Sequence, residues 1–367
     1  YVCLFTTALL GALVLVLFWI FRVKDNSKLP PGPLALPIVG NLPFLDKNAP
    51  YKSMMEFSKT YGPVMTMYLG WQRAVVLVGY DAVKEALVDQ GEDFSGRAPV
   101  HFLYKATRGY GVGISNGERW RQLRRFTLST LRDFGMGRKP MDMWIQEESK
   151  HMIAHINTLK GKPFDPTFIL SKTVSNVICC LVFSERFRSE DTQFLRQLQI
   201  LNKFIKFNST PFGQVSLNVI LHKIEEHMKT LDPSSPRDFI DCFLIRMHQE
   251  KDNPHSEFHF ENLWSTVLNL FAAGTETTSS TIRFALKKMQ EEIDPVIGQE
   301  RSPNMDDRKS LPFCDAVIHE VQRFIDLVPF SLPHYALKDI TFRGYTIPKV
   351  KHVCPVLKLP NMILDKH

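Results

Sequence analysis

An acid and several hydroxyls interrupt an otherwise apolar stretch near the middle of the chain. Residues 263–286 are mostly apolar or small, and the sequence Gly-Thr-Glu-Thr-Thr lies inside them at 274–278. Such a stretch predicts a buried helix, where a carboxyl group is costly unless it is paired or handles protons. Ala273 and Thr277 are one turn apart on one face, and Gly274 beside them removes bulk, so the helix offers a small space beside a hydroxyl and an acid. We interpret Glu276 and Thr277 as a candidate site.

A simpler interpretation of the same residues stays open. The Ser and Thr side chains could bond back to carbonyls of their own helix, and the Glu could reach the surface. These five residues alone do not distinguish a proton-handling site from a helix with back-bonded hydroxyls, so the other motifs of the chain are needed.

A second group of residues suits an anionic ligand. Trp120 and Arg124 are one turn apart on a predicted helix that also carries Arg119, Arg121 and Arg125. One face could hold an anion while the neighbouring face presents positive charge outward. The alternative is an ordinary basic surface helix.

Another pair, Glu320 and Arg323, is spaced so that the two side chains can meet on a helix. Such pairs occur often by chance, so this signal is weak by itself.

Composition narrows the function classes. The formal charge is +7, but Lys and Arg are spread along the chain, which does not indicate nucleic-acid binding. None of the six cysteines forms a C-x-x-C pair, so we expect buried thiols in a reducing compartment rather than a zinc or disulfide framework. These are Cys3, Cys179, Cys180, Cys242, Cys314 and Cys354.

The first 21 residues carry no charge, and Arg22, Lys24 and Lys28 follow them. As a helix they would span roughly 30 Å, the thickness of a bilayer core. We therefore predict a single membrane anchor at 1–21 with the body in the cytosol. A cleaved signal peptide is the alternative, but the run is long and ends without a small-residue cleavage site.

The elements that must position these residues are mainly helical. Most of 116–289 is expected to be helix, including one that begins at Ser235-Pro236 with the serine as its cap. Two β-hairpins are expected, one from 64–69 and 74–78, the other at 341–347 around Arg343-Gly344. The predicted organisation is an anchor at 1–21, a basic and proline-rich hinge at 22–38, a domain at 39–349 and a divergent tail at 350–367.

In order and spacing, these pieces resemble a microsomal cytochrome P-450. The resemblance covers the anchor, the hinge Leu-Pro-Pro-Gly-Pro at 29–33 and Phe-Ser-Gly-Arg at 94–97. It continues through Trp120-x-x-x-Arg124, Ala-Gly-Thr-Glu-Thr-Thr at 273–278 and Glu320-x-x-Arg323 to Phe-Ser-Leu-Pro-His at 330–334. The chain looks most like the vertebrate family-two enzymes, with a fish subfamily as the finer interpretation.

The resemblance implies a mainly α P-450 fold with small β-sheets and an N-terminal transmembrane helix. It implies a haem whose propionates are held by four side chains: Arg97, Trp120, Arg124 and His334. Glu276 and Thr277 would deliver protons to the bound dioxygen, Ala273 would face a lipophilic substrate, and Glu320 with Arg323 would lock the core. The body would face the cytosol at the endoplasmic reticulum, where Arg121 and Arg125 would meet an acidic NADPH-cytochrome P-450 reductase.

The resemblance breaks off near the C-terminus. The family's axial cysteine lies in a Phe-x-x-Gly-x-Arg-x-Cys-x-Gly loop, and Cys354 lies in Lys-His-Val-Cys-Pro without those glycines. Two joins, at 214–215 and 286–290, also look abrupt. We therefore expect a truncated P-450 fold that is incomplete at the C-terminal end, with no protein ligand for a metal and doubtful haem binding. Its family function is oxidation of fatty acids or lipophilic foreign compounds. The alternative is a non-enzymatic, membrane-anchored remnant that binds reductase or lipid.

Overall fold

The computed structural model of the protein describes residues 11, 28–99, 104, 107–188, 191–192, 194–196, 198, 217–285, 290–298, 301–325, 332–349 and 352–356. Two compact units divide the chain, one from Tyr1–Ala98 with Val328–His367 and the other Pro99–Leu327. The anchor predicted at 1–21 lies outside the described residues except for Gly11. No helix within the described ranges is long and apolar enough to cross a membrane.

The first unit is built on a five-stranded sheet with the strand order β1-β2-β7-β4-β3. Both hairpins expected from the sequence are confirmed, the first as β1 and β2 and the second as β5 and β6, which form their own two-stranded sheet. The strands are β1 (Val64–Leu69), β2 (Gln72–Val78), β3 (Gly96–Arg97), β4 (His334–Tyr335), β5 (Ile340–Phe342), β6 (Tyr345–Ile347) and β7 (His352–Val356).

Helical segments flank these strands, and apolar side chains of the strands pack against them. Arg343 takes a positive φ of 50° in the turn of the second hairpin, and Gly344 follows with 82°. The segments of this unit are η1 (Leu42–Phe44), α2 (Pro50–Tyr61), α3 (Tyr80–Lys84) and η2 (Glu85–Asp89).

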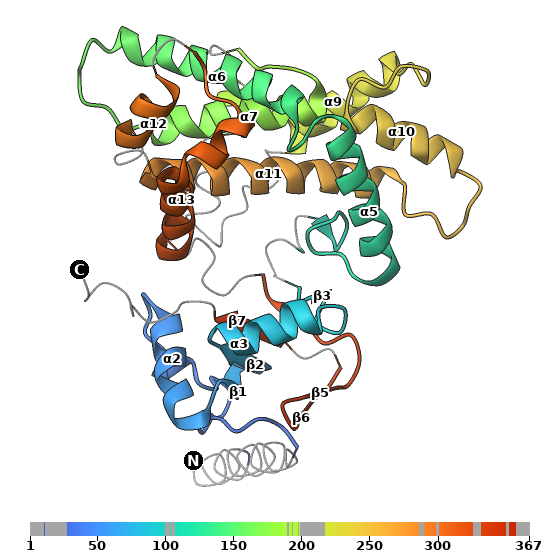
Figure 1. Ribbon diagram of the computed structural model, residues 1–367. Helices are drawn as coiled ribbons and strands as arrows, with labels where there is room; N and C mark the ends of the chain where they lie inside the picture. The colour runs from blue at the N-terminus through green and yellow to red at the C-terminus, as the bar shows by residue number, and fades with distance from the viewer. Residues whose placement is uncertain are drawn as a thin grey trace, which may run out of the picture. The chain divides into compact units, whose positions relative to one another are not determined.

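The second unit is helical, as the sequence predicted. Figure 1 shows α11 running along this unit with α7 beside it, and the two helices are in extensive contact. Its elements are α5 (Gly117–Asp133), α6 (Lys139–Thr158), α7 (Thr167–Phe183), α9 (Leu217–Thr230), α10 (Phe239–Gln249), α11 (Phe260–Ala285), α12 (Gln290–Ile297), η4 (Met305–Ser310) and α13 (Pro312–Ile325). The join predicted at 214–215 lies outside the described residues, as do residues 286–289 of the other join.

One predicted helix start was wrong. Helix α10 begins at Phe239, and its cap is Asp238 rather than Ser235. Asp238 has an extended backbone, with φ at −161°, and its Oδ1 accepts the N–H of Asp241 at 3.0 Å. The carboxylate satisfies a backbone donor of the first turn, which is the usual function of an N-cap side chain.

Candidate functional site

Helix α11 is buried along one face, as its apolar pattern predicted. Leu263, Val267 and Phe271 recur every four residues and pack into the main apolar cluster of the unit. Thr275 and Ser279 continue this row and are also buried. Their hydroxyls meet serines of α7, with 2.9 Å between Thr275 Oγ1 and Ser175 Oγ and 3.3 Å between the hydroxyls of Ser279 and Ser171.

A different face of α11 carries the candidate residues. Ala273 and Thr277 are exposed and Glu276 is half-buried. Thr277 Oγ1 donates to the carbonyl of Ala273 at 2.7 Å, so the back-bonding alternative is correct for this hydroxyl. The oxygen of such a hydroxyl keeps its own acceptor sites, so back-bonding leaves it able to accept a proton. Ser280 Oγ lies 3.5 Å from Glu276 Oε1, at the limit of a hydrogen bond.

The small space expected near this face is not at Gly274. A Cβ at this position would lie 2.8 Å from Cδ1 of Ile178 on α7. The missing side chain therefore lets α7 approach α11, and Ile178 fills the gap. The prediction that Gly274 opens space beside Glu276 and Thr277 was wrong, because a neighbouring helix takes that space.

In the first unit, strand pairing brings Arg97 and His334 together. They are register partners in β3 and β4, and Arg97 Nη1 lies 2.6 Å from His334 Nε2. His334 Nδ1 lies 2.6 Å from the carbonyl oxygen of Phe94 and must donate to it. Nε2 is then the acceptor for the guanidinium, so the ring is neutral. Burial, and then the Arg97 charge, lower the pKa of His334, in agreement with a neutral ring.

In the second unit, α5 aligns its aromatic and basic side chains. The Arg124 guanidinium lies 5.2 Å from the ring centroid of Trp120, which is a cation–π contact. Arg121 and Arg125 are exposed on the same helix, and Arg121 Nη1 is 3.7 Å from Glu118 Oε2. Arg124 has no acidic partner within the part of the chain that the structure describes. Its charge is therefore available to an anionic ligand.

The predicted pair on α13 does form. Arg323 donates to both carboxylate oxygens of Glu320, with 2.6 Å between Nε and Oε2. The Arg323 side chain is 38% exposed and that of Glu320 is 55% exposed. The pair is thus a surface pair within the described residues, and its expected function of locking a core stays a prediction.

The described cysteines lie where burial favours the protonated thiol. Burial raises the pKa of Cys180, Cys242, Cys314 and Cys354 to about 11 and raises that of Cys179 well above its usual range. Cys354 lies in β7 and packs among apolar side chains of the first unit. A thiol in an apolar environment resists deprotonation, and Cys179, Cys314 and Cys354 are buried while Cys180 and Cys242 are half-buried. Cys3 lies outside the described residues.

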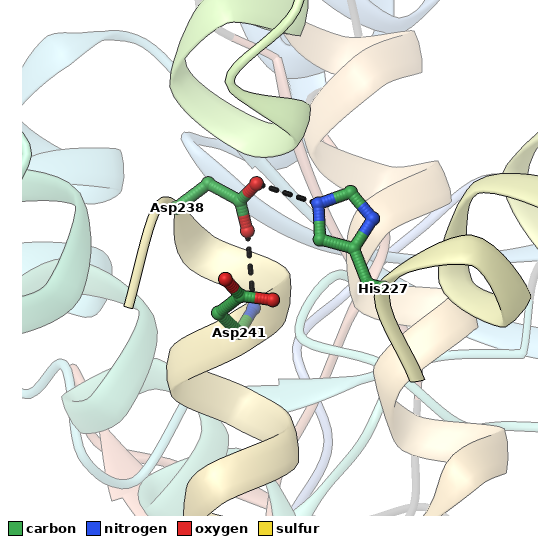
Figure 2. Close-up of side chains that lie close together, drawn as sticks. All are labelled: His227, Asp238 and Asp241. Atoms are coloured by element: carbon green, nitrogen blue, oxygen red, sulfur yellow. Dashed lines mark hydrogen bonds and ion pairs between the residues drawn. The ribbon is translucent and has the colours of Figure 1, made fainter. Parts of the chain in front are cut away.

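Sequence reasoning missed one buried polar cluster. His227 of α9 contacts Asp238 at the start of α10, beside Asp241 (Figure 2). The Pro-Arg-Asp sequence at 236–238 had been read only as a helix start. The missed signal was a histidine eleven residues upstream, whose partner depends on how the two helices pack.

The candidate haem residues fit a haem only in part. Arg97, oriented by His334, and Arg124, aligned on Trp120, are guanidinium groups suited to carboxylates such as haem propionates. Cys354 lies inside β7 rather than in a glycine-containing ligand loop. Arg97 and His334 belong to the first unit, and the other candidate residues belong to the second.

Comparison with known proteins places these residues in a family. The family model for cytochrome P450 matches residues 30–219 and 212–359. The chain is 45% identical to Cytochrome P450 2G1 of Oryctolagus cuniculus over 388 residues, covering 96% of the chain and 78% of that protein. It is also 45% identical to Cytochrome P450 2C8 of Homo sapiens over 370 residues, covering 91% and 76%.

The chain therefore belongs to the cytochrome P450 family, whose members are haem-thiolate monooxygenases, and its relatives include family-two members. This confirms the resemblance seen in the sequence motifs and the expected haem cofactor of the family. The fish subfamily stays a prediction.

Proposed function

We propose that the fold of this chain serves the oxidation of fatty acids or lipophilic foreign compounds, with dioxygen and electrons from NADPH. The observation that carries the proposal is on α11, where Ala273 and Thr277 are exposed beside the half-buried Glu276. An acid next to an alcohol on one accessible face suits controlled proton transfer. The apolar side chain of Ala273 on that face suits a lipophilic substrate.

The haem of the family would be held through its propionates by Arg97, Trp120, Arg124 and His334. The neutral ring of His334 has its Nδ1 hydrogen on Phe94 and its Nε2 lone pair on Arg97. We assign His334 to orienting the Arg97 guanidinium, which then binds the carboxylate. A bound haem supplies the redox chemistry on dioxygen, while Glu276 and Thr277 hold and pass protons.

The electron donor would be NADPH-cytochrome P-450 reductase, and Arg121 and Arg125 would form its docking face. Both are exposed on α5, away from the side of the helix that carries the buried Leu123 and Thr127. Attraction between such exposed charges and an acidic partner weakens as salt is added. Residues 1–21 would anchor the protein in the endoplasmic reticulum membrane by a single span, with the body in the cytosol.

We also propose that residues 1–367 do not by themselves form a working haem-thiolate centre. The support is the position of Cys354, which lies inside β7 between β2 and β4 and packs among apolar side chains. A thiolate ligand is what favours O–O cleavage in a P-450, and a cysteine inside a paired strand is not placed in the ligand loop of the family.

A hemin titration of the full chain tests this. After reduction and carbon monoxide treatment, we expect no red-shifted thiolate band. The positive control is a chimera, the loop chimera, in which the family's Phe-x-x-Gly-x-Arg-x-Cys-x-Gly loop and following segment replace residues 357–367, so that β7 is kept. The chimera should show the band. Stoichiometric binding with a thiolate band in residues 1–367, lost in Cys354→Ser, would overturn the proposal.

The position of Cys354 also favours a second candidate function, that of a membrane-anchored remnant that binds reductase or lipid without turnover. Salt-sensitive reductase binding that is weakened by Arg121→Glu/Arg125→Glu, in a chain without the thiolate band, would support it. A loop chimera that shows the band but oxidises no lipophilic substrate would count against the monooxygenase proposal.

A further inference from the structure

Three metal-type side chains meet in the interior where α9 adjoins α10. The ligand atoms of His227, Asp238 and Asp241 all lie within 4.8 Å of one another, and all three residues are buried. Figure 2 shows the imidazole pointing at the Asp238 carboxylate, which in turn bonds the backbone of Asp241. A histidine with two carboxylates is a donor set that divalent metals use, so the cluster has the composition of a metal site.

The hydrogen bonds argue against a metal. His227 Nδ1 lies 2.7 Å from the carbonyl oxygen of Lys223, and Nε2 lies 2.7 Å from Asp238 Oδ2. A ligating histidine must offer a lone pair, but here each nitrogen faces an oxygen acceptor. Both nitrogens can be satisfied only when both carry hydrogen, which is the charged imidazolium form.

The carboxylate of Asp241 is also already hydrogen-bonded, in this case by Arg237. The Arg237 guanidinium donates to both oxygens of Asp241, at 2.6 and 2.9 Å, and the Arg237 backbone N–H adds a third bond at 3.1 Å. Two cations, His227 and Arg237, therefore stand against two carboxylates, Asp238 and Asp241. The charges of the cluster balance, which is the condition for burying ionic groups.

We propose that His227 is a pH-sensitive latch, which holds α9 onto the start of α10 while its ring is protonated and loosens this corner when the ring loses its proton. The latch bears on the α11 site because the same apolar cluster contains Ile224 of α9, Phe243 of α10 and Val267 of α11. Asp238 connects both effects, since one of its oxygens binds the ring and the other caps α10.

Burial and the neighbouring charges act on the protonation of His227 in opposite directions. Burial opposes the charged ring, but the Asp238 carboxylate outweighs burial, and the pKa of His227 is raised. On the α10 side, burial would raise the pKa of Asp241, yet Arg237 outweighs it and lowers that pKa. On α9, Lys223 is bonded to Glu226 at 2.8 Å, the pKa of Lys223 is raised and that of Glu226 is lowered.

The sign of the pH dependence follows from the raised pKa. The stabilisation is fully present below the ordinary histidine pKa of about 6.5. It is lost as the pH rises from there through the raised pKa of the folded state, because the unfolded or opened chain then gives up its proton first. Local opening should grow by up to about tenfold per pH unit within that window, since one proton is linked to it.

Amide hydrogen exchange on the full chain between pH 6 and 9 tests the latch. Protection factors are corrected for the intrinsic pH dependence of exchange. We expect protection in α9 and α10 to fall across the window, while α6 keeps its protection. Protection of α9 and α10 that is flat over this range in the wild-type chain would overturn the latch, whether or not any variant folds.

Two variants and a matched control sharpen the test. Asp238→Asn keeps a helix cap, because Asn caps as well as Asp, but removes the anion; the pH dependence should move to lower pH. His227→Gln should abolish it. His222→Gln is the control, since His222 is on the same helix at 3.3 Å from Glu226 but is 63% exposed, and its pH profile should match wild type.

Zinc titration completes the design. If His227 is a latch and not a metal ligand, zinc does not raise the melting temperature through this residue. The wild-type chain and His227→Gln should then respond to zinc in the same way. Stabilisation by equimolar zinc that disappears in His227→Gln would show a metal site instead and overturn the proposal.

Discussion

Two glutamates of the helical unit show how differently one residue type can be used. Glu148 on α6 is 3% exposed, and its carboxylate binds the Arg186 guanidinium and, at 3.1 Å, the amide of Asn176. Glu276 on α11 is half-buried, with the Ser280 hydroxyl 3.5 Å from its Oε1.

The difference lies in burial and in what surrounds each carboxylate. Asn176 also exchanges two hydrogen bonds with the backbone of Phe187, so the Glu148 network ties α6 and α7 to the segment after α7. A buried carboxylate that holds such a network together serves structure. Glu276 lies beside the exposed Ala273 and Thr277, which suits its proposed function. We therefore expect changes at Glu148 to affect stability and changes at Glu276 and Thr277 to affect chemistry.

The largest stability effect is expected at Glu148. Glu148→Ala leaves the partly buried Arg186 and the buried Asn176 without their acceptor, which should lower the free energy of unfolding by about 2–4 kcal/mol. Chemical denaturation measures it. The matched control is Glu147→Ala, because the neighbouring side chain is 57% exposed and pairs only with the exposed side chains of Lys150, at 3.9 Å, and His151, at 3.3 Å, among its described contacts. That change should cost about 0.5 kcal/mol or less. Equal losses in the two variants would remove the distinction.

A smaller stability effect is expected at Glu276. Glu276→Gln keeps the shape and an acceptor oxygen, so unfolding should change by less than about 1 kcal/mol. In the loop chimera, however, the same variant should lower product formation by about tenfold or more, because an amide cannot release a proton. Product formed per NADPH consumed is the measurement. A variant that loses stability but keeps its product yield would assign Glu276 to structure instead.

The elements with local signals were predictable from the sequence. The run around 263–286 gave α11, because apolar residues every three or four positions define a helix face. Turn residues gave both hairpins. The family motifs placed Arg97 and His334 together although 237 residues separate them. That pairing came from resemblance, since no local pattern encodes it.

The parts that could not be predicted depend on how elements pack. His227 and Asp238 meet because α9 and α10 fold against each other, and no local sequence pattern around either residue indicates the other. The gap at Gly274 was predicted to be open space because nothing in the sequence shows that Ile178 of α7 lies there. The start of α10 was misplaced by three residues because both Ser235 and Asp238 are good caps, and only the backbone angle of Asp238 decides between them.

The smallest stability effect is expected at Thr277, and it gives the sharpest test of the comparison. Its hydroxyl is exposed and bonds only to a carbonyl of its own helix among the contacts described, so Thr277→Ala should change unfolding by about 0.5 kcal/mol or less. In the loop chimera, the same variant should divert electrons from product to hydrogen peroxide, because the hydroxyl that accepts and passes protons beside Glu276 is gone. The ratio of peroxide to NADPH consumed measures this. Thr281→Ala is the matched control, because Thr281 is one turn further along α11 and makes the same kind of bond, to the Thr277 carbonyl at 2.9 Å. If both variants couple electrons to product equally well, Thr277 has no function in proton delivery, and this face of α11 is only a surface.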